Sequence, residues 1–192
     1  MNATKLSPFH LCEEEHTLLR HLAKDAVEYG LAHAMLIPVE MARYPRPLRE
    51  TGACFVTLNL RGELRGCIGT LSAYQPLVED VAHNAYAASF SDPRFMPLTE
   101  KEFAGVEIHL SVLTPYTPMH FNSEADLLSQ IRPGVDGLLL EDAYHRGTFL
   151  PAVWESLPEA TQFLQHLKQK AGLPANYWSN TLKVSRYTSD SF

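Results

Sequence analysis

The stretch CFVTLNLRGELRGCIG, residues 54–69, limits the possible folds more than any other part of the chain. Its first half alternates between two sets of side chains, as a β-strand with one buried face does. One set comprises Cys54, Val56, Leu58 and Leu60, and the other comprises Phe55, Thr57 and Asn59. The RGE that follows is typical of a tight turn between antiparallel strands. The stretch therefore predicts a β-hairpin in which the chain returns from Leu64 onward.

Single helices are predicted between further strands. Residues 13–30 and 76–90 carry apolar side chains at helical spacing, and TEKE at 99–102 is a capping box that opens a short helix. Other predicted elements are a strand at 106–113, a hairpin at 137–151, a helix at 158–171 and a strand at 181–187. Strands in hairpins with single helices between them predict an α+β fold with a largely antiparallel sheet and flanking helices.

Two proline-rich breaks, at residues 38–51 and 114–118, interrupt these elements. The chain has 192 residues, enough for one sizeable domain or for two small lobes that share a core. We expect the breaks to separate two lobes. A cleft between lobes is a common place for a ligand.

The charge and the N-terminal sequence exclude several classes of protein. A net charge of −6 argues against general binding to nucleic acid or to anionic membranes, because both need a basic face. The N-terminal residues lack the apolar core of a signal peptide, and no apolar stretch is long enough to span a bilayer. Three cysteines without CxxC spacing argue against a disulfide scaffold. We therefore expect a cytoplasmic protein that binds neither nucleic acid nor membrane.

Cys67 is the first candidate for chemistry. A cysteine acts as a nucleophile only as the thiolate, and a neighbouring arginine lowers the pKa of a thiol. Positions i and i+2 of a strand share a face, so we expect Arg65 to stand beside Cys67. Gly66 would let backbone N–H groups approach a bound anion closely. The alternative is that Cys67 is a small packing residue, because free cysteines are usually buried.

Asp92 and Arg94 lie in the loop sequence SDPRF, with Pro93 between them. Arg94 could bind a carboxylate or a phosphate while Asp92 acts as a base. The alternative is an ion pair that only stabilises the loop.

Glu107, His109 and Ser111 share one face of the predicted strand at 106–113. If this face lines a cleft, the three residues supply acid–base groups. If it meets solvent, they are the polar side of an amphipathic strand.

The sequence indicates neither a metal site nor a cofactor. The nine histidines form no HxH or HExxH pattern, and the cysteines have no zinc spacing. Neither GxGxxG nor GxxxxGK[ST] occurs, so no dinucleotide or P-loop site is predicted.

Five stretches, taken in order, match a known family. They are FVTLNLRGELRGCIGTL (55–71), PLVEDVAHNAYAASFSDPRFMPLTEKE (76–102), VEIHLSVLTP (106–115), GVDGLLLEDAYHRGTFLPAVW (134–154) and FLQHLKQKAGL (163–173). The chain resembles the AMMECR family, whose bacterial and archaeal members are called AmmeMemoRadiSam system protein A. The resemblance covers residues 10–188 and leaves residues 1–9 as an N-terminal extension.

The resemblance implies one continuous AMMECR domain. Its larger subdomain would hold both termini, its smaller subdomain would be inserted, and a groove would lie between them. Two partners are also implied, a Memo-like protein related to extradiol dioxygenases and a radical-SAM protein. The resemblance does not imply a reaction.

The family's candidate pocket residues carry over motif by motif. They are Arg65, Cys67, Asp92, Arg94 and Glu107. We add Ser111 as a weaker candidate, and Gly66 as a binding residue on the backbone argument given above. The first hypothesis is a ligand-binding or partner-dependent component. The alternative is a cysteine-dependent hydrolase or transferase. In that enzyme Cys67 attacks a small anionic substrate, Asp92 or Glu107 moves protons, and Arg94 binds the anion.

Overall fold

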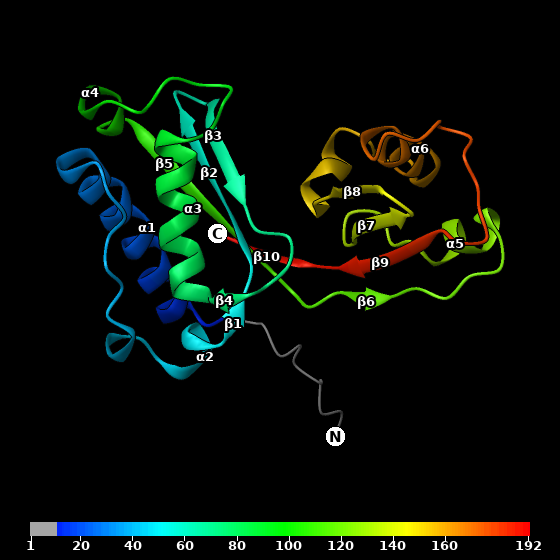
Figure 1. Ribbon diagram of the computed structural model, residues 1–192, viewed down its shortest axis with the longest axis horizontal. Helices are drawn as coiled ribbons and strands as arrows, with labels where there is room; N and C mark the ends of the chain where they lie inside the picture. The colour runs from blue at the N-terminus through cyan, green and yellow to red at the C-terminus, as the bar shows by residue number, and fades with distance from the viewer. Residues whose placement is uncertain (1–10) are drawn as a thin grey trace. The chain divides into compact units, whose positions relative to one another are not determined.

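The computed structural model describes residues 11–192, and these form two compact units (Figure 1). Unit 1 consists of residues 11–113 and Asp190–Phe192, and unit 2 of Thr114–Ser189. Both units combine antiparallel strands with helices, which confirms the predicted α+β fold. Residues 1–9, the predicted N-terminal extension, lie outside the described residues. Within 11–192, no helix combines the length and the apolar character that a membrane span needs.

A four-stranded sheet with the order β10-β5-β2-β3 forms the centre of unit 1. Its strands are β2 (Cys54–Leu60), β3 (Glu63–Gly69), β5 (Val106–Leu113) and β10 (Ser189–Ser191). β2 pairs antiparallel with β3 on one side and with β5 on the other. Arg61 and Gly62 connect β2 to β3 with φ values of 57° and 82°, which a two-residue hairpin turn requires. The hairpin predicted at 54–69 is therefore confirmed.

Two helices, α1 (Glu13–His33) and α3 (Leu77–Phe90), cover one face of this sheet (Figure 1). The covered face carries the apolar set of the predicted alternation, including Val56, Leu58 and Leu110, all fully buried. Small side chains on α3 allow it to approach the sheet closely; they are Ala82, Ala85 and Ala88. Neither helix covers the opposite face, which we call the helix-free face.

The remaining elements of unit 1 are short. They are β1 (Thr51–Gly52), its partner β4 (Gln75–Pro76), η1 (Met41–Arg43), α2 (Arg46–Arg49) and α4 (Glu100–Phe103). α4 begins at the predicted capping box, in which the Thr99 hydroxyl accepts from the backbone N–H of Glu102 and the Glu102 carboxylate accepts from that of Thr99.

A β-bulge interrupts the pairing of β2 with β3. Leu58 is opposite Gly66, but the next residue of β2, Asn59, is opposite Leu64. Arg65 is therefore the extra residue, and the regular alternation of side chains breaks at this position.

Gly66 is the point at which β3 meets α3 most closely. A Cβ atom at this residue would lie 2.2 Å from the backbone oxygen of Ala88. Only glycine fits there without a shift of either backbone.

Unit 2 contains a second sheet with the order β6-β9-β7-β8. Its strands are β6 (Thr117–Pro118), β7 (Gly137–Asp142), β8 (His145–Phe149) and β9 (Lys183–Tyr187). The helical elements are α5 (Glu124–Gln130), η2 (Pro151–Glu155) and α6 (Ala160–Lys170). The apolar side of α6 joins the inner face of the sheet in a buried core that includes Leu138, Leu140, Phe163, Leu164, Leu167 and Val184.

Candidate functional site

Cys67 lies in β3, and the loop after α3 holds both of its backbone polar groups. Its N–H donates to Oδ2 of Asp92 at 2.9 Å, and its carbonyl oxygen accepts from Nη2 of Arg94 at 3.2 Å. β3 is the last strand of the sheet, and such a strand otherwise presents unpaired backbone groups. Asp92 and Arg94 therefore cover this edge at Cys67 as a neighbouring strand would.

The side chain of Asp92 is 2% exposed, and both of its oxygens are occupied. Oδ1 accepts from the backbone N–H and from Nε of Arg94, at 3.1 and 3.0 Å. Oδ2 accepts from Nη2 of Arg94 at 2.7 Å in addition to the N–H of Cys67. The Arg94 guanidinium outweighs burial and, with the two backbone N–H groups, holds the pKa of Asp92 well below its usual range. This geometry favours the loop-stabilising role of Asp92 over proton transfer.

Arg65 forms an ion pair with Glu102. Its Nε and Nη2 donate to the two carboxylate oxygens of Glu102 at 2.9 and 3.2 Å, and Nη2 also donates to the carbonyl of Met96 at 2.9 Å. No hydrogen bond or ion pair joins Arg65 to Cys67 in the described part of the chain. We expected the two side chains together because of their i, i+2 spacing, and the bulge at Arg65 breaks that alternation.

Glu102 belongs to this site although the sequence analysis did not single it out. The Arg65 guanidinium, together with the backbone and hydroxyl of Thr99, lowers the pKa of Glu102 to about 2. The TEKE pattern predicts the capping box. It gives no signal for the ion pair, because Arg65 is 37 residues away in the chain.

Phe95 contacts both arginines of the site. The Cζ atoms of Arg65 and Arg94 lie 5.7 and 5.4 Å from its ring centroid, within the range of a cation–π contact. Among the described residues, Nη1 of each guanidinium has no hydrogen-bond acceptor; in Arg65 this atom is buried. The Arg94 side chain is 53% exposed. Arg94 is therefore the arginine that can donate a hydrogen bond to a ligand at the surface.

Cys67, Thr57 and His109 form one row across the helix-free face. Thr57 is directly opposite Cys67 on β3 and directly opposite His109 on β5. The Thr57 hydroxyl donates to Sγ of Cys67 at 3.3 Å. Because neighbouring strands are about 4.8 Å apart, Cys67 and His109 are separated by about 10 Å along this row. His109 is thus too far away to act as a directly bonded base for the thiol.

Glu107 and Ser111 share the helix-free face but lie in other rows of it. Glu107 is exposed, and its carboxylate is 3.9 Å from Nε2 of His109, longer than a hydrogen bond. The hydroxyl of Ser111 lies 2.9 Å from that of Ser191 on β10. Neither residue has a hydrogen bond to Cys67 within the described residues.

The three cysteines occupy different environments. Cys54 is fully buried on the helix-covered face, and burial, followed by the charge of Asp80, raises the pKa of its thiol. Cys12 is exposed at the start of α1, and Cys67 is half-buried. Of the three, Cys67 alone combines access to solvent with a place in the candidate site.

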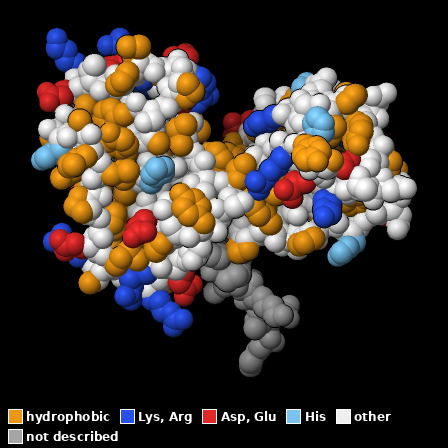
Figure 2. Space-filling view, in the orientation of Figure 1, with side chains coloured by type: hydrophobic (Ala, Val, Ile, Leu, Met, Phe, Trp, Pro, Cys, Tyr) orange, Lys and Arg blue, Asp and Glu red, His pale blue; other side chains and the backbone are white. Residues whose placement is uncertain are grey.

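On the face seen in Figure 2, basic and acidic side chains are interspersed over each unit. No group of three or more His, Cys, Asp and Glu side chains within residues 11–192 is placed to hold a metal ion.

Comparison with known proteins finds similar chains in archaea. A family model described as AMMECR1 matches residues 20–192. A protein of Methanothermobacter thermautotrophicus is 35% identical over 190 residues, which are 95% of each chain. Protein MJ0810 of Methanocaldococcus jannaschii is 34% identical over 187 residues, 93% of this chain and 90% of that protein. The crystal structure of Uncharacterized Protein PH0010 from Pyrococcus horikoshii matches with a TM-score of 0.87 and 32% identity, over 94% of this chain and 92% of that one. The names of these proteins state no activity.

Proposed function

The chain belongs to the AMMECR1 family, and we propose that it serves as a binding component that acts with partner proteins. Its binding surface is the helix-free face of the unit 1 sheet, at the edge formed by Cys67 and Arg94. The partners are those that the family resemblance implies, a Memo-like protein and a radical-SAM protein.

The proposal rests mainly on the hydrogen bonds that Asp92 makes. A cysteine enzyme needs a base within hydrogen-bond reach of its thiol, and a third group that orients the base. Asp92 is the carboxylate nearest to Cys67 in the hydrogen-bond network, and its oxygens are filled by Arg94 and by a backbone N–H. The described residues therefore lack a base in contact with Cys67, whereas the surface around it is rigidly held.

The chemistry of this surface suits a small anionic ligand or an acidic group of a partner. Arg94 is half exposed and retains Nη1 as a free donor. The charge of Arg94 is already paired with Asp92. A bound anion would therefore gain a charge-assisted hydrogen bond, but it would not neutralise an unpaired cation. We expect such an anion to bind modestly by itself and more tightly as part of a larger partner surface.

Capture of the two partners by charge-reversed variants tests the proposal. Glu107→Lys reverses a charge on the helix-free face, where this side chain is 72% exposed. Glu28→Lys makes the same change on α1, on the other side of unit 1, where Glu28 is 51% exposed. We expect Glu107→Lys to strengthen capture of a purified partner several-fold, because an acidic group of the partner is repelled by a carboxylate at this surface and attracted by an ammonium group. Glu28→Lys and Cys67→Ser are expected to bind like the wild type.

Two results would overturn the proposal. One is the failure of the wild-type chain to bind either partner at micromolar concentration. The other is the same change of capture in Glu107→Lys and in Glu28→Lys, which would place the contact away from the helix-free face.

A second candidate function, a cysteine enzyme, is favoured by one contact. The Thr57 hydroxyl donates to Sγ of Cys67, and such a donor stabilises a thiolate. If this contact activates the thiol, Thr57→Val will slow alkylation of Cys67 by iodoacetamide several-fold in a Cys12→Ala background. The binding role predicts the same labelling rate with and without the hydroxyl.

A further inference from the structure

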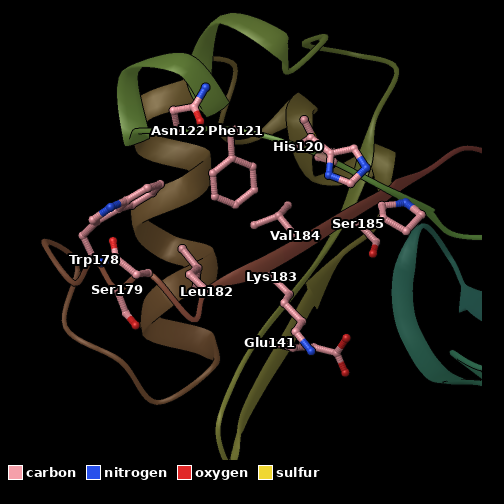
Figure 3. A pocket seen from close by; sticks show the side chains of 13 residues that line it. His120, Phe121, Asn122, Glu141, Trp178, Ser179, Leu182, Lys183, Val184 and Ser185 are labelled. Atoms are coloured by element: carbon pink, nitrogen blue, oxygen red, sulfur yellow. The ribbon is translucent and has the colours of Figure 1, made fainter.

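Unit 2 contains a hollow of about 720 Å³ that none of the sequence-predicted site residues lines (Figure 3). Leu182 and Val184 form its floor, and the segments 120–122 and 178–180 form two of its walls. We propose that this hollow binds an uncharged nucleobase or nucleoside. The inference is independent of the proposed function, because it uses no residue of unit 1.

Two aromatic rings supply a stacking surface in the hollow. The centroids of Phe121 and Trp178 are 5.6 Å apart, and the rings are inclined by 59°. Figure 3 shows them next to each other above Leu182 and Val184. Aromatic side chains stack with any base, because every base has a π-face, and apolar groups beneath them exclude water.

Free polar side chains complete the lining. His120, Asn180 and Ser185 line the hollow, and their side chains make no hydrogen bond within the described part of the chain. An asparagine amide offers a donor and an acceptor side by side, which is the arrangement that pairs with the edge of a base. These side chains therefore offer both hydrogen-bond donors and acceptors, as recognition of the polar edge of a nucleobase requires.

The charges at the hollow favour a neutral ligand over a phosphorylated one. Glu141 and Lys183 both line it, and they are opposite each other in the pairing of β7 with β9. Glu141 is also paired with Nε of Arg146 at 3.3 Å. The lining itself therefore offers a phosphate one cation beside one carboxylate rather than a cluster of cations. The chain as a whole carries −6, which further disfavours a nucleotide.

Hydrogen bonds to a buried carboxylate hold the segment that carries Trp178. Asp142 is 4% exposed and accepts from the hydroxyls of Tyr177 at 2.8 Å and of Thr181 at 2.6 Å. Lys168 is fully buried and lies 5.8 Å from the Trp178 ring, with its ammonium bonded to Glu124 at 2.7 Å. These contacts hold the indole in place before any ligand arrives.

Hydrogen bonds also hold the segment that carries His120 and Phe121 on the other side of the hollow. The N–H of Met119 donates to the carbonyl of Val184 at 2.9 Å, and the Gln130 amide donates to the carbonyl of His120 at 2.9 Å. A hollow whose walls are already ordered loses little entropy when it binds a small molecule.

The two tryptophans of the chain allow a direct test by NMR. Trp178 lines the hollow, whereas Trp154 is buried in the core of unit 2, where its indole N–H donates to the backbone carbonyl of Asp136. In a ¹H–¹⁵N spectrum of the full chain, titration with adenosine or uridine should shift the indole signal of Trp178 saturably. The signal of Trp154 should not move. Trp178→Phe assigns the two signals and retains an aromatic ring.

Variants of two asparagines supply the matched control. Asn180→Ala removes a free amide from the hollow and should weaken nucleoside binding about fivefold, as the loss of one hydrogen bond does. Asn176→Ala removes an exposed amide outside the hollow and should leave the affinity unchanged.

Four outcomes would overturn the inference. The first three are the absence of a saturable shift at millimolar nucleoside, an equal effect of the two asparagine variants, and binding of glucose in preference to both nucleosides. Tighter binding of adenosine monophosphate than of adenosine would also contradict it, because the hollow would then select the phosphate.

Discussion

The backbone of Cys67 is bonded to the side chain of Asp92 as it would be to a neighbouring strand, with the N–H of Cys67 donating to Oδ2 at 2.9 Å. Arg94 completes the pairing from the other side by donating to the carbonyl of Cys67. Two side chains of the loop SDPRF therefore bond the backbone of Cys67 in the way that a neighbouring strand would. Its charged residues fix the position of Cys67 in the sheet, and the predictions below follow from this arrangement.

Asp92→Asn is expected to destabilise the protein. The substitution removes the charge and places an amide nitrogen against donors, either Arg94 or the N–H of Cys67. Because hydrogen bonds to charged groups contribute about 1.5–3 kcal/mol, we expect a loss of about 2 kcal/mol in the free energy of unfolding. Urea denaturation followed by circular dichroism measures it. Asp25→Asn, at an exposed position on α1, is the control and should change stability by less than about 0.5 kcal/mol.

The stability should depend on pH through Asp92 and Glu102. Both carboxyls have a lower pKa in the folded chain than in the unfolded chain, where it is about 4. Their contribution is therefore complete above about pH 5 and is lost as the pH falls toward the folded pKa, which for Glu102 is about 2. The stability difference between the wild type and Asp92→Asn should shrink between about pH 5 and pH 2. A difference that stays constant from pH 7 to pH 2.5 would show that the Asp92 carboxylate is not responsible.

Gly66→Ala should be strongly destabilising. The new methyl group would lie 2.2 Å from the carbonyl oxygen of Ala88, so β3 or α3 must shift. Overpacking of this kind costs about 1–3 kcal/mol. Gly105→Ala is the matched control, since its methyl group would lie 3.4 Å from the end of a leucine side chain. Equal midpoints of urea unfolding for the two variants would contradict the close contact of β3 with α3.

Asp80→Asn should be among the most costly single substitutions in unit 1. Asp80 is fully buried and accepts four hydrogen bonds, from the backbone N–H of Cys54 and from the side chains of Thr70, Gln75 and Asn84. An amide in its place turns one acceptor into a donor that faces other donors. We expect a loss of about 3 kcal/mol, measured against Asp25→Asn. A loss as small as that of the control would mean that the network adjusts without cost.

The sequence predicts the backbone of the candidate site well because short-range patterns determine it. Strict alternation at 54–60 and the turn after it specify the hairpin that carries Cys67. The capping box at 99–102 is equally local, and it forms as predicted.

The contacts between these elements could not be predicted in the same way. The bulge at Arg65 lies next to the close contact of Gly66 with α3, and it interrupts the alternation from which the sequence predicts Arg65 beside Cys67. The pairing of Arg65 with Glu102 joins residues that no local pattern relates. For Asp92 and Arg94 the sequence offers both an ion pair and a ligand site. The geometry favours the ion pair, because it fills both oxygens of Asp92.

Labelling of the three cysteines tests the central claim most directly. Iodoacetamide is added to the full chain, with and without a purified partner, and mass spectrometry follows each cysteine in turn. Cys12 is exposed, Cys54 is buried and serves as an internal blank, and Cys67 reports on the helix-free face. The account predicts that a bound partner slows labelling of Cys67 at least about fivefold and leaves Cys12 unchanged, because an interface excludes reagent from the surface it buries. Labelling of Cys67 at the same rate in the presence of a bound partner would contradict the account.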